Sequence, residues 1–358
     1  MTTHDNQRPS TSRIRFRWGI ILFAVVLLCV LYIPLPYYVT RPGSAIELAP
    51  MIKVEGGTKD EKGSFMLTTV RMGEATPFWY LYSKLSPDVE LIDEDLVLSH
   101  GETDDDFTQR ELEVMHNSQQ LAEAVAFKRA GYPVKIEKQG VLVMGTLAGM
   151  PAKNLLKVGD VITQVDEKKL QTAQDLLDYL TKKKPGESIQ LKFLRGSQEM
   201  SGSITLASLP DENGQASKRV GLGIRPENKQ YIEIPKKVNI TAEGIGGPSA
   251  GLMMTLEIYD QLKTDIDLTR GYRIAGTGTI SADGTVGRIG GINHKIVAAD
   301  KAGAEIFFAP NDVTTGQVSN YQEAVETAKR IGTKMIVVPV KTVDDAINYL
   351  QKLKPKQG

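Results

Sequence analysis

The segment that most constrains the fold of this chain is an uncharged, strongly apolar stretch near the N-terminus. Residues 18–33 read WGIILFAVVLLCVLYI, and the run continues without a charge to Val39, broken only by Pro34 and Pro36. A helix needs about 20 apolar residues to cross a bilayer. We therefore expect residues 18–39 to form a transmembrane helix rather than part of a globular core.

Charged residues around this stretch predict its orientation. Four arginines precede it closely, and few cations follow it. Positive charge stays on the cytoplasmic side, so the tail 1–17 is predicted to be cytoplasmic and the rest of the chain extracellular. A cleaved signal peptide is the alternative, with GSA at 43–45 as a weak cleavage site. A lipoprotein signal is disfavoured, because Leu28 stands where a small residue should precede Cys29.

Composition excludes several classes of function. The net charge is zero, which does not suggest a nucleic-acid partner. Cys29 is the only cysteine, so neither an internal disulfide nor a cysteine-based metal site can form. The four histidines have no zinc-motif spacing. We expect no metal and no cofactor. The 358 residues suffice for about two domains.

The middle of the chain has the pattern of a small strand-rich domain. Residues 40–60 are interpreted as a tether, and short alternating strands begin near 131. The motif LKVGDVI at 156–162 follows a small-residue turn. The region 131–207 resembles a PDZ domain of the bacterial type. Such domains bind a peptide as an added strand.

The resemblance to PDZ domains also implies where a peptide would bind. It places the peptide-binding loop and strand at Gly131, Tyr132 and Val134, although Pro133 removes one backbone amide there. A spacer domain that binds no ligand is the alternative.

A glycine-rich turn further along carries a candidate nucleophile. An alternating strand leads into GIGGPSAG at 244–251, and proline is tolerated in the first turn of a helix, which is expected to begin near Pro248. Ser249 is therefore predicted at a helix N-terminus, where free amides favour an oxyanion. Serine needs a base. Lys295 follows another Gly-Gly turn beside an apolar helix face, and burial there would lower its pKa.

These motifs together resemble the proteolytic domain of Lon proteases. GGPSAG around Ser249, a GGxxxK ending at Lys295, and Thr277-Gly278 between them match that family's pattern. The resemblance implies a Ser249–Lys295 dyad and a hydroxyl of Thr277 that contacts the lysine. It also implies supporting roles for the residues that flank the nucleophile, namely Gly247, Pro248 and Ala250.

Two positions depart from the Lon pattern, and the rest of the chain extends the resemblance. Thr279 and Gly246 stand where the family usually has acidic residues. The helix expected at 108–130 and the C-terminal elements also look Lon-like. The predicted fold class is α+β: a Lon-type domain over 61–130 and 208–355, with the PDZ inserted and one N-terminal transmembrane helix. This architecture is similar to PDZ-containing Lon-like membrane peptidases of Gram-positive bacteria.

The predicted function is an ATP-independent serine endopeptidase that cleaves exported peptides or unfolded proteins at the membrane. No Walker A motif occurs in the sequence. A homo-oligomer is expected by analogy with Lon rings. One alternative is a non-catalytic membrane PDZ scaffold. Another is an α/β-hydrolase-type esterase, because G-x-S-x-G also occurs around Ser249. That fold needs a histidine, and His294 is predicted to be exposed beside the base.

Overall fold

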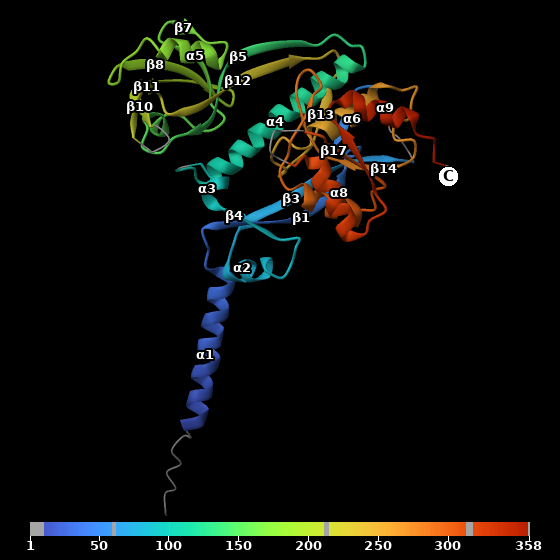
Figure 1. Ribbon diagram of the computed structural model, residues 1–358. Helices are drawn as coiled ribbons and strands as arrows, with labels where there is room; N and C mark the ends of the chain where they lie inside the picture. Colours follow the sequence, from blue (N-terminus) through green and yellow to red (C-terminus); the bar gives the residue numbers. More distant parts are fainter. Residues whose placement is uncertain (1–10, 59–61, 100, 211–214, 313–317, 357–358) are drawn as a thin grey trace, which may run out of the picture. The chain divides into compact units, whose positions relative to one another are not determined.

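The computed structural model describes residues 11–58, 62–99, 101–210, 215–312 and 318–356 (Figure 1). The first ten residues of the predicted cytoplasmic tail lie outside the described residues. The chain forms two compact units, which are described separately below. The smaller unit comprises the chain up to Arg41 together with Arg71–Val97, and the larger unit comprises Pro42–Val70 and everything from Leu98 onward.

Helix α1 (Thr11–Tyr32) opens the smaller unit and ends earlier than the sequence predicted. Pro34 and Pro36 cannot continue a helix, so the predicted end at residue 39 was wrong. Val39 instead lies buried in strand β1 (Tyr37–Glu47). Among the residues that the structure describes, no helix reaches the length and apolarity required to cross a membrane.

The remaining elements of the smaller unit follow β1. The start of β1 pairs antiparallel with β4 (Glu90–Asp93), with Tyr37 opposite Asp93. The short helices α2 (Pro77–Ser83) and α3 (Glu94–Val97) flank β4 in the sequence. A small apolar cluster around Val39, Ala75 and Val89 holds this unit together.

The segment expected to be a tether, residues 40–60, is ordered structure over its described part, 40–58. It contains most of β1 and then β2 (Ile52–Val54), which pairs antiparallel with β13 (Val238–Ile240). Leu48 and Ile52 are fully buried in the main core. The tether prediction was therefore wrong, because the alternation in Ile-Lys-Val supports a half-buried strand despite the neighbouring glycines and charges.

The larger unit contains a sheet in the order β18-β17-β14-β3-β1. Its central pairings are parallel, between β3 and β14, β14 and β17, and β17 and β18. The strands not yet delimited are β3 (Ser64–Glu74), β14 (Arg273–Gly276), β17 (Ile306–Pro310) and β18 (Ile336–Val340). A small antiparallel hairpin, β15 (Thr279–Ile280) with β16 (Val286–Gly287), follows β14.

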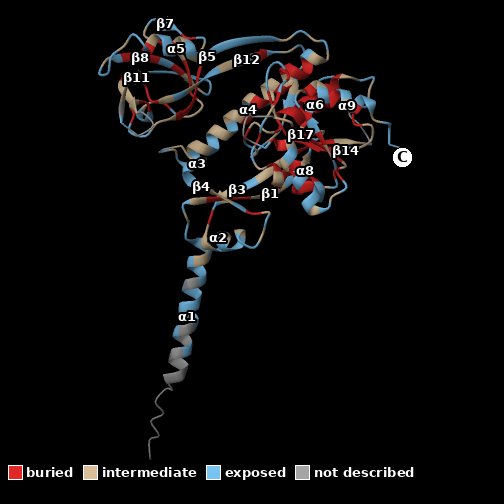
Figure 2. Ribbon diagram, viewed as in Figure 1, coloured by how far each residue is buried: buried red, intermediate tan, exposed pale blue. Residues whose placement is uncertain are grey.

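Helices cover both faces of this sheet, and the alternating strand residues explain why. Phe65 and Phe308 point into a core shared with α4, α6 and α9, while Met66 and Phe307 point into a core shared with α7 and α8. The helices are α4 (Asp104–Arg129), α6 (Gly251–Leu262), α7 (Ile292–Lys301), α8 (Asn320–Ile331) and α9 (Val343–Lys352). Every residue of α6 is buried, which Figure 2 shows as a red helix.

The insert between α4 and β13 has its own sheet in the order β12-β5-β6-β8-β9, with helix α5 and a separate apolar core. In β8, Ile189, Leu191 and Phe193 alternate inward, as the sequence predicted. Strand β12 lies beyond residue 207, where the insert was expected to end, and pairs with β5. The bounds are β5 (Lys135–Thr146), η1 (Pro151–Asn154), β6 (Val161–Val165), β7 (Lys168–Lys169), α5 (Ala173–Leu180), β8 (Ser188–Arg195), β9 (Gln198–Thr205), β10 (Ala207–Pro210), β11 (Ala216–Gly221) and β12 (Ile224–Glu233).

Candidate active site

The candidate nucleophile lies in the turn that leads into α6. Ser249 comes two residues before the first residue of that helix, so the helix begins slightly later than the sequence predicted. Ser249 is partly exposed, whereas the helix behind it is buried. In the described part of the chain, the amide N–H groups of Ser249 and Ala250 have no hydrogen-bond acceptor. They are donors at the positive end of the helix dipole.

Lys295 reaches this turn from the second turn of α7. Its Nζ donates to the Ser249 Oγ at 2.9 Å and to the carbonyl oxygen of Thr68 at 2.7 Å. Only 2% of Lys295 is exposed. This burial lowers the pKa of its amine from 10.5 to about 7, because the charged form loses its hydration. A neutral amine beside a serine hydroxyl is a base in position to accept a proton.

Thr277 lies beside the pair, but its hydroxyl makes a different contact from the one that the resemblance implied. Thr277 Oγ1 donates to the carbonyl oxygen of Ser249 at 2.9 Å, and the Gly278 amide donates to the same oxygen at 2.9 Å. This hydroxyl therefore donates to the backbone of Ser249, whereas the resemblance implied a contact with Lys295. Thr277 therefore restrains the backbone of the nucleophile.

Helix α4 holds the other side of the turn. The Gly247 amide donates to the carbonyl oxygen of Glu111 at 3.0 Å, and the buried Ser118 hydroxyl donates to the carbonyl oxygen of Pro248 at 3.1 Å. A Cβ on Gly246 would lie 2.8 Å from the Cβ of Glu111. The acidic residue that Lon proteases carry at this position would collide with Glu111.

Two contributors to the site were missed by the sequence analysis. Glu111 supplies a carboxylate against the turn: its Oε2 lies 3.2 Å from where a Cβ of Gly247 would be, and burial raises the pKa of this carboxyl group. Thr68 contributes only a carbonyl oxygen from β3. Neither carries a sequence signal, since Glu111 is one of many glutamates and a carbonyl can come from any residue type.

His294, the residue on which the esterase alternative depends, is buried. Its exposed fraction is 1%, so the prediction of an exposed side chain was wrong. It follows Asn293 on α7 and packs near Gly291, whose positive φ of 65° caps the helix. Lys295, rather than His294, makes the hydrogen bond to the Ser249 hydroxyl. Among the described residues, no group of acidic, histidine or cysteine side chains is arranged to hold a metal ion.

The structure places the three predicted peptide-binding residues outside the core of the insert. Gly131 directly follows α4, and the Tyr132 ring packs against Phe127 with centroids 5.6 Å apart. Tyr132 and Val134 both contact the core of the protease-like part. These residues belong to the connection between the helix and the first strand of the insert, and they lie on no free edge of its sheet.

A different segment of the insert combines a free strand edge with a glycine-containing turn, the features that a peptide-binding site of this type needs. Strand β12 is the edge of the insert's sheet, and in the described part of the chain it pairs only with β5. Its other edge lies next to α5, where the Ala173 amide donates to Asn228 Oδ1 at 2.8 Å. The turn before β12 reads GLGI at 221–224, with Leu222 buried and Gly223 at a φ of 81°. Two glycines around one apolar residue before a strand were an available signal.

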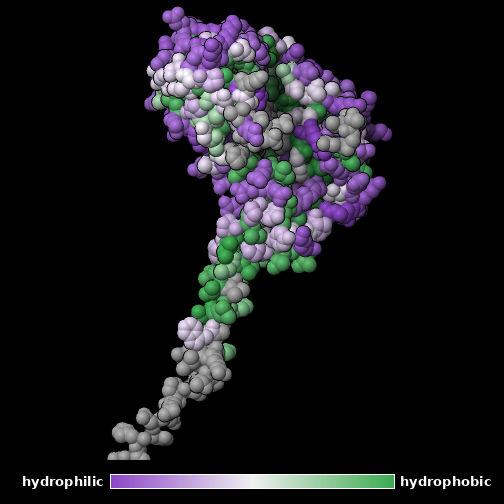
Figure 3. All heavy atoms as spheres, turned by 60° about the vertical axis from the view of Figure 1, so that its left-hand side comes forward, coloured by the Kyte–Doolittle hydropathy of each residue, from purple (hydrophilic) through white to green (hydrophobic). Residues whose placement is uncertain are grey.

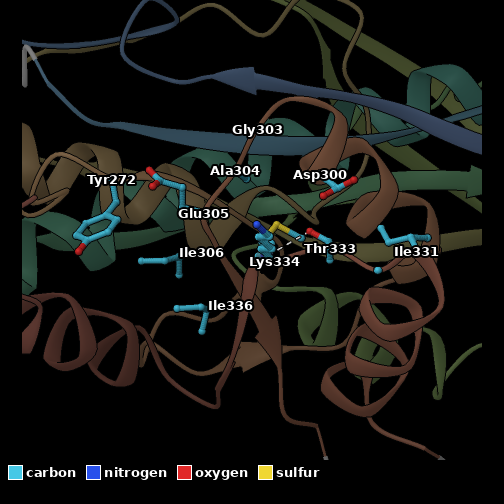
Figure 4. A pocket seen from close by; sticks show the side chains of 12 residues that line it. Tyr272, Asp300, Gly303, Ala304, Glu305, Ile306, Ile331, Thr333, Lys334 and Ile336 are labelled. Atoms are coloured by element: carbon cyan, nitrogen blue, oxygen red, sulfur yellow. Dashed lines mark hydrogen bonds between the residues drawn. The ribbon is translucent and has the colours of Figure 1, made fainter.

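The hollow shown in Figure 4 is separate from this constellation. It has a volume of about 530 Å³ and lies at the ends of β17 and β18, with Tyr272, Glu305 and Lys334 in its wall. Glu305 is paired with Lys356 at 2.8 Å. None of the candidate catalytic residues lines it.

Comparison with known proteins agrees with the two-part architecture. Residues 129–206 match the family model of the PDZ domain, and residues 215–352 match that of the Lon protease (S16) C-terminal proteolytic domain. A Lon protease from Azospirillum brasilense is 29% identical over 168 residues, which cover 45% of this chain and 20% of that protein. An archaeal Lon protease from Methanocaldococcus jannaschii is 30% identical over 156 residues, covering 44% and 22%.

Two further matches are to a DegP-like endoprotease and to the structure of a PDZ domain. A probable periplasmic serine endoprotease, DegP-like, from Bartonella henselae is 23% identical over 210 residues, covering 58% of this chain and 34% of that protein. The crystal structure of the PDZ domain of an SdrC-like protein from Listeria monocytogenes is 30% identical and covers 25% of this chain and 87% of that one, with a TM-score of 0.22. The chain spans about a third or less of the length of the full-length relatives. The two family-model matches and the Lon relatives support a serine peptidase that combines a Lon-type proteolytic domain with a PDZ domain.

Proposed function

We propose that this chain is a serine endopeptidase that cuts polypeptides with Ser249 as nucleophile and Lys295 as general base, without ATP. The observation that carries the proposal is the 2.9 Å contact between the Ser249 hydroxyl and an amine that burial makes half neutral near pH 7. Ordinary lysine, with a pKa near 10.5, would hold about one neutral amine in three thousand at that pH. Burial therefore makes Lys295 usable as a base.

The proposed reaction uses each group of the site in turn. The Ser249 Oγ attacks the scissile carbonyl carbon while its proton passes to the lone pair of the Lys295 Nζ. The hydrogen bond to the Thr68 carbonyl holds that amine in orientation. The resulting oxyanion is stabilised by the amides of Ser249 and Ala250, and such donors contribute about 3–4 kcal/mol each. The C–N bond then breaks as the Lys295 ammonium returns its proton to the leaving amine.

The second half of the reaction regenerates the enzyme. Water attacks the ester carbonyl on Ser249 while Lys295, again neutral, takes a proton from it. The acid product leaves, and the proton returns to the Ser249 Oγ. Two hydrogen bonds to the Ser249 carbonyl, from Thr277 and Gly278, keep the nucleophile's backbone in place throughout.

We further propose that the chain is anchored in a membrane through the apolar part of α1, with exported peptides or unfolded proteins as substrates. The support is the uncharged run at 18–33, preceded by four arginines, and the exposed apolar side chains that α1 carries, such as Leu22, Phe23 and Leu28. Exposed apolar surface of this extent marks an interaction site.

For the insert, we propose that a peptide adds as a strand to the free edge of β12, facing α5, with its C-terminal carboxylate near the turn at 221–224. The amides of Leu222 and Gly223 have no acceptor in the described part of the chain. Leu177 of α5 is exposed and offers an apolar contact. Strand addition of this kind gives affinity through main-chain hydrogen bonds.

The peptidase proposal is tested with the full chain in detergent and a fluorogenic unfolded polypeptide, without nucleotide. Wild type should cleave it. Ser249→Ala and Lys295→Ala should each lose at least 10³-fold in kcat/KM, because the nucleophile or its base is gone. His294→Ala should keep the dyad and most of the activity. Full activity in Lys295→Ala, or loss only in His294→Ala, contradicts the dyad.

A further inference from the structure

Helix α2 and the two residues after it carry an unusual exposed aromatic surface. The segment 77–85 reads PFWYLYSKL, and no residue of α2 is buried. Leu81 is 61% exposed and Leu85 is 83% exposed. The rings of Phe78 and Tyr82 stack 5.9 Å apart with an interplanar angle of 10°. Soluble surfaces rarely concentrate aromatic and aliphatic side chains in this way.

Backbone hydrogen bonds fix the start of α2 at the end of α1. The Leu35 amide donates to the carbonyl oxygen of Ala75 at 2.8 Å, and the Ala75 amide donates to the carbonyl oxygen of Tyr37 at 2.8 Å. Ala75 is two residues before α2, and Leu35 is three residues after α1. The Tyr37 and Tyr80 rings lie 6.1 Å apart. The aromatic helix therefore lies where the apolar helix ends, and Figure 3 shows hydrophobic residues continuing from α1 onto the adjoining surface of the same unit.

The one charged residue in the stretch 75–87 is Lys84, and the acidic residues Glu74 and Asp88 lie just outside it. The Arg41 guanidinium lies 4.8 Å from the centre of the Trp79 ring, and the Lys84 ammonium lies 5.3 Å from the centre of the Tyr80 ring. Aromatic rings with adjacent cations and no carboxylates within the stretch suit the headgroup region of a bilayer, where Trp and Tyr accumulate and anionic lipids attract Lys and Arg.

We propose that α2, together with Leu85, is a second membrane-contact element that lies in the headgroup and upper acyl region of the bilayer. The inference rests on the proposed anchoring through α1, because α1 is what brings this surface to a membrane. A second copy of the chain could also cover this exposed surface. The bilayer is favoured because the patch adjoins the apolar helix directly and combines rings with cations, as an interfacial helix does.

The test uses tryptophan fluorescence of the full chain in vesicles of zwitterionic and anionic lipids. The chain has two tryptophans, so Trp18→Phe with Trp79→Phe gives a silent background. Leu81→Trp in that background reports on α2. Leu96→Trp, also exposed in the smaller unit but flanked by Glu94 and Asp95, is the matched control. Trp79→Phe alone leaves Trp18 to report on α1. Peptidase activity of each variant checks that it is folded.

Vesicles whose lipids carry bromine near the carbonyl end of their acyl chains should quench the fluorescence of the Leu81→Trp reporter at least twofold and shift its emission to shorter wavelength. The Leu96→Trp reporter should change little. If Trp18 is quenched but the Leu81→Trp reporter behaves like Leu96→Trp, anchoring stands and the inference about α2 is overturned. If neither Trp18 nor the Leu81→Trp reporter is quenched, both proposals fail. If the fluorescence of the Leu81→Trp reporter changes with protein concentration but not with brominated lipid, the inference is overturned in favour of contact with a second copy of the chain.

Discussion

Replacing Lys295 by methionine should make the protein more stable while abolishing its activity. The pKa of this lysine is lowered from 10.5 to about 7 by burial, so the folded state disfavours the ammonium. At about 1.4 kcal/mol per pH unit, protonation costs the folded state about 5 kcal/mol at pH values below 7. Methionine has a similar length, and it can be buried without that cost.

The substitution also removes hydrogen bonds. Without the amine, the buried carbonyl of Thr68 loses its donor, which costs about 1–3 kcal/mol. Subtracting this cost from the protonation cost that the substitution removes leaves a predicted increase of about 2–4 kcal/mol in the free energy of unfolding at pH 6. Between pH 7 and 10.5 the unfolded chain holds the lysine proton and the folded protein does not, so wild-type stability rises with pH in this window. The advantage of Lys295→Met should therefore shrink towards pH 10.

Urea denaturation of the full chain in detergent, followed by circular dichroism at pH 6, 7 and 9, measures this advantage. Lys301→Met is the control, because Lys301 is exposed on the same helix and should change stability by less than about 0.5 kcal/mol. A Lys295→Met variant that is less stable than wild type at pH 6 would refute the reasoning. It would mean that the folded protein holds Lys295 in its charged form and that neighbouring groups offset the cost of burying that charge.

Three further substitutions test the surroundings. Ser118→Ala should lower kcat up to about tenfold with little change in KM, because the turn before the nucleophile loses a hydrogen bond; steady-state kinetics decides this. Gly246→Ala should reduce both activity and stability, because the new Cβ would lie 2.8 Å from the Cβ of Glu111. A second change, Glu111→Gly, removes that Cβ and should restore part of the activity, as a double-mutant cycle would show. Arg195→Ala should destabilise the insert by about 1–3 kcal/mol in thermal denaturation, because Asp160 is 1% exposed and loses its bidentate partner but keeps the Lys157 amide as a donor.

The dyad was accessible from the sequence because each half has a local signature. A glycine-rich turn before an apolar helix identified Ser249, and a second Gly-Gly turn before a helix identified Lys295. The structure brings the two side chains within hydrogen-bond distance because α6 and α7 both start at the same end of the parallel sheet, at the carboxyl end of β14. Ligands and active sites gather at this edge in such sheets.

The contributions from distant segments could not be predicted in the same way. The Thr68 carbonyl and the Glu111 side chain come from elements more than a hundred residues before Ser249, and nothing local indicates their proximity. For Thr277, the family resemblance predicted the right neighbourhood but not the partner of the hydroxyl.

The insert shows why the sequence could not place residues 131–134 relative to the edge of its sheet. Its sheet is completed by β12, a strand that follows the rest of the domain in the sequence, so the expected loop at 131–134 became a connection packed on the protease-like part. Strand order cannot be deduced from alternation alone, because every half-buried strand has the same period. The prediction of a tether at 40–60 failed for a related reason. Three residues suffice to form β2 once a distant partner strand, β13, is available, and the sequence does not indicate that partner.

The pH dependence of kcat/KM tests the central claim, that Lys295 is a neutral base, most directly. With a pKa of about 7, about a tenth of the free enzyme holds a neutral Lys295 at pH 6, half at pH 7 and nine tenths at pH 8. Activity should therefore rise roughly tenfold from pH 6 to 8 and then level off, with the same inflection in His294→Ala. A profile that keeps rising tenfold per pH unit up to pH 10, or an inflection that disappears with His294, would contradict the account.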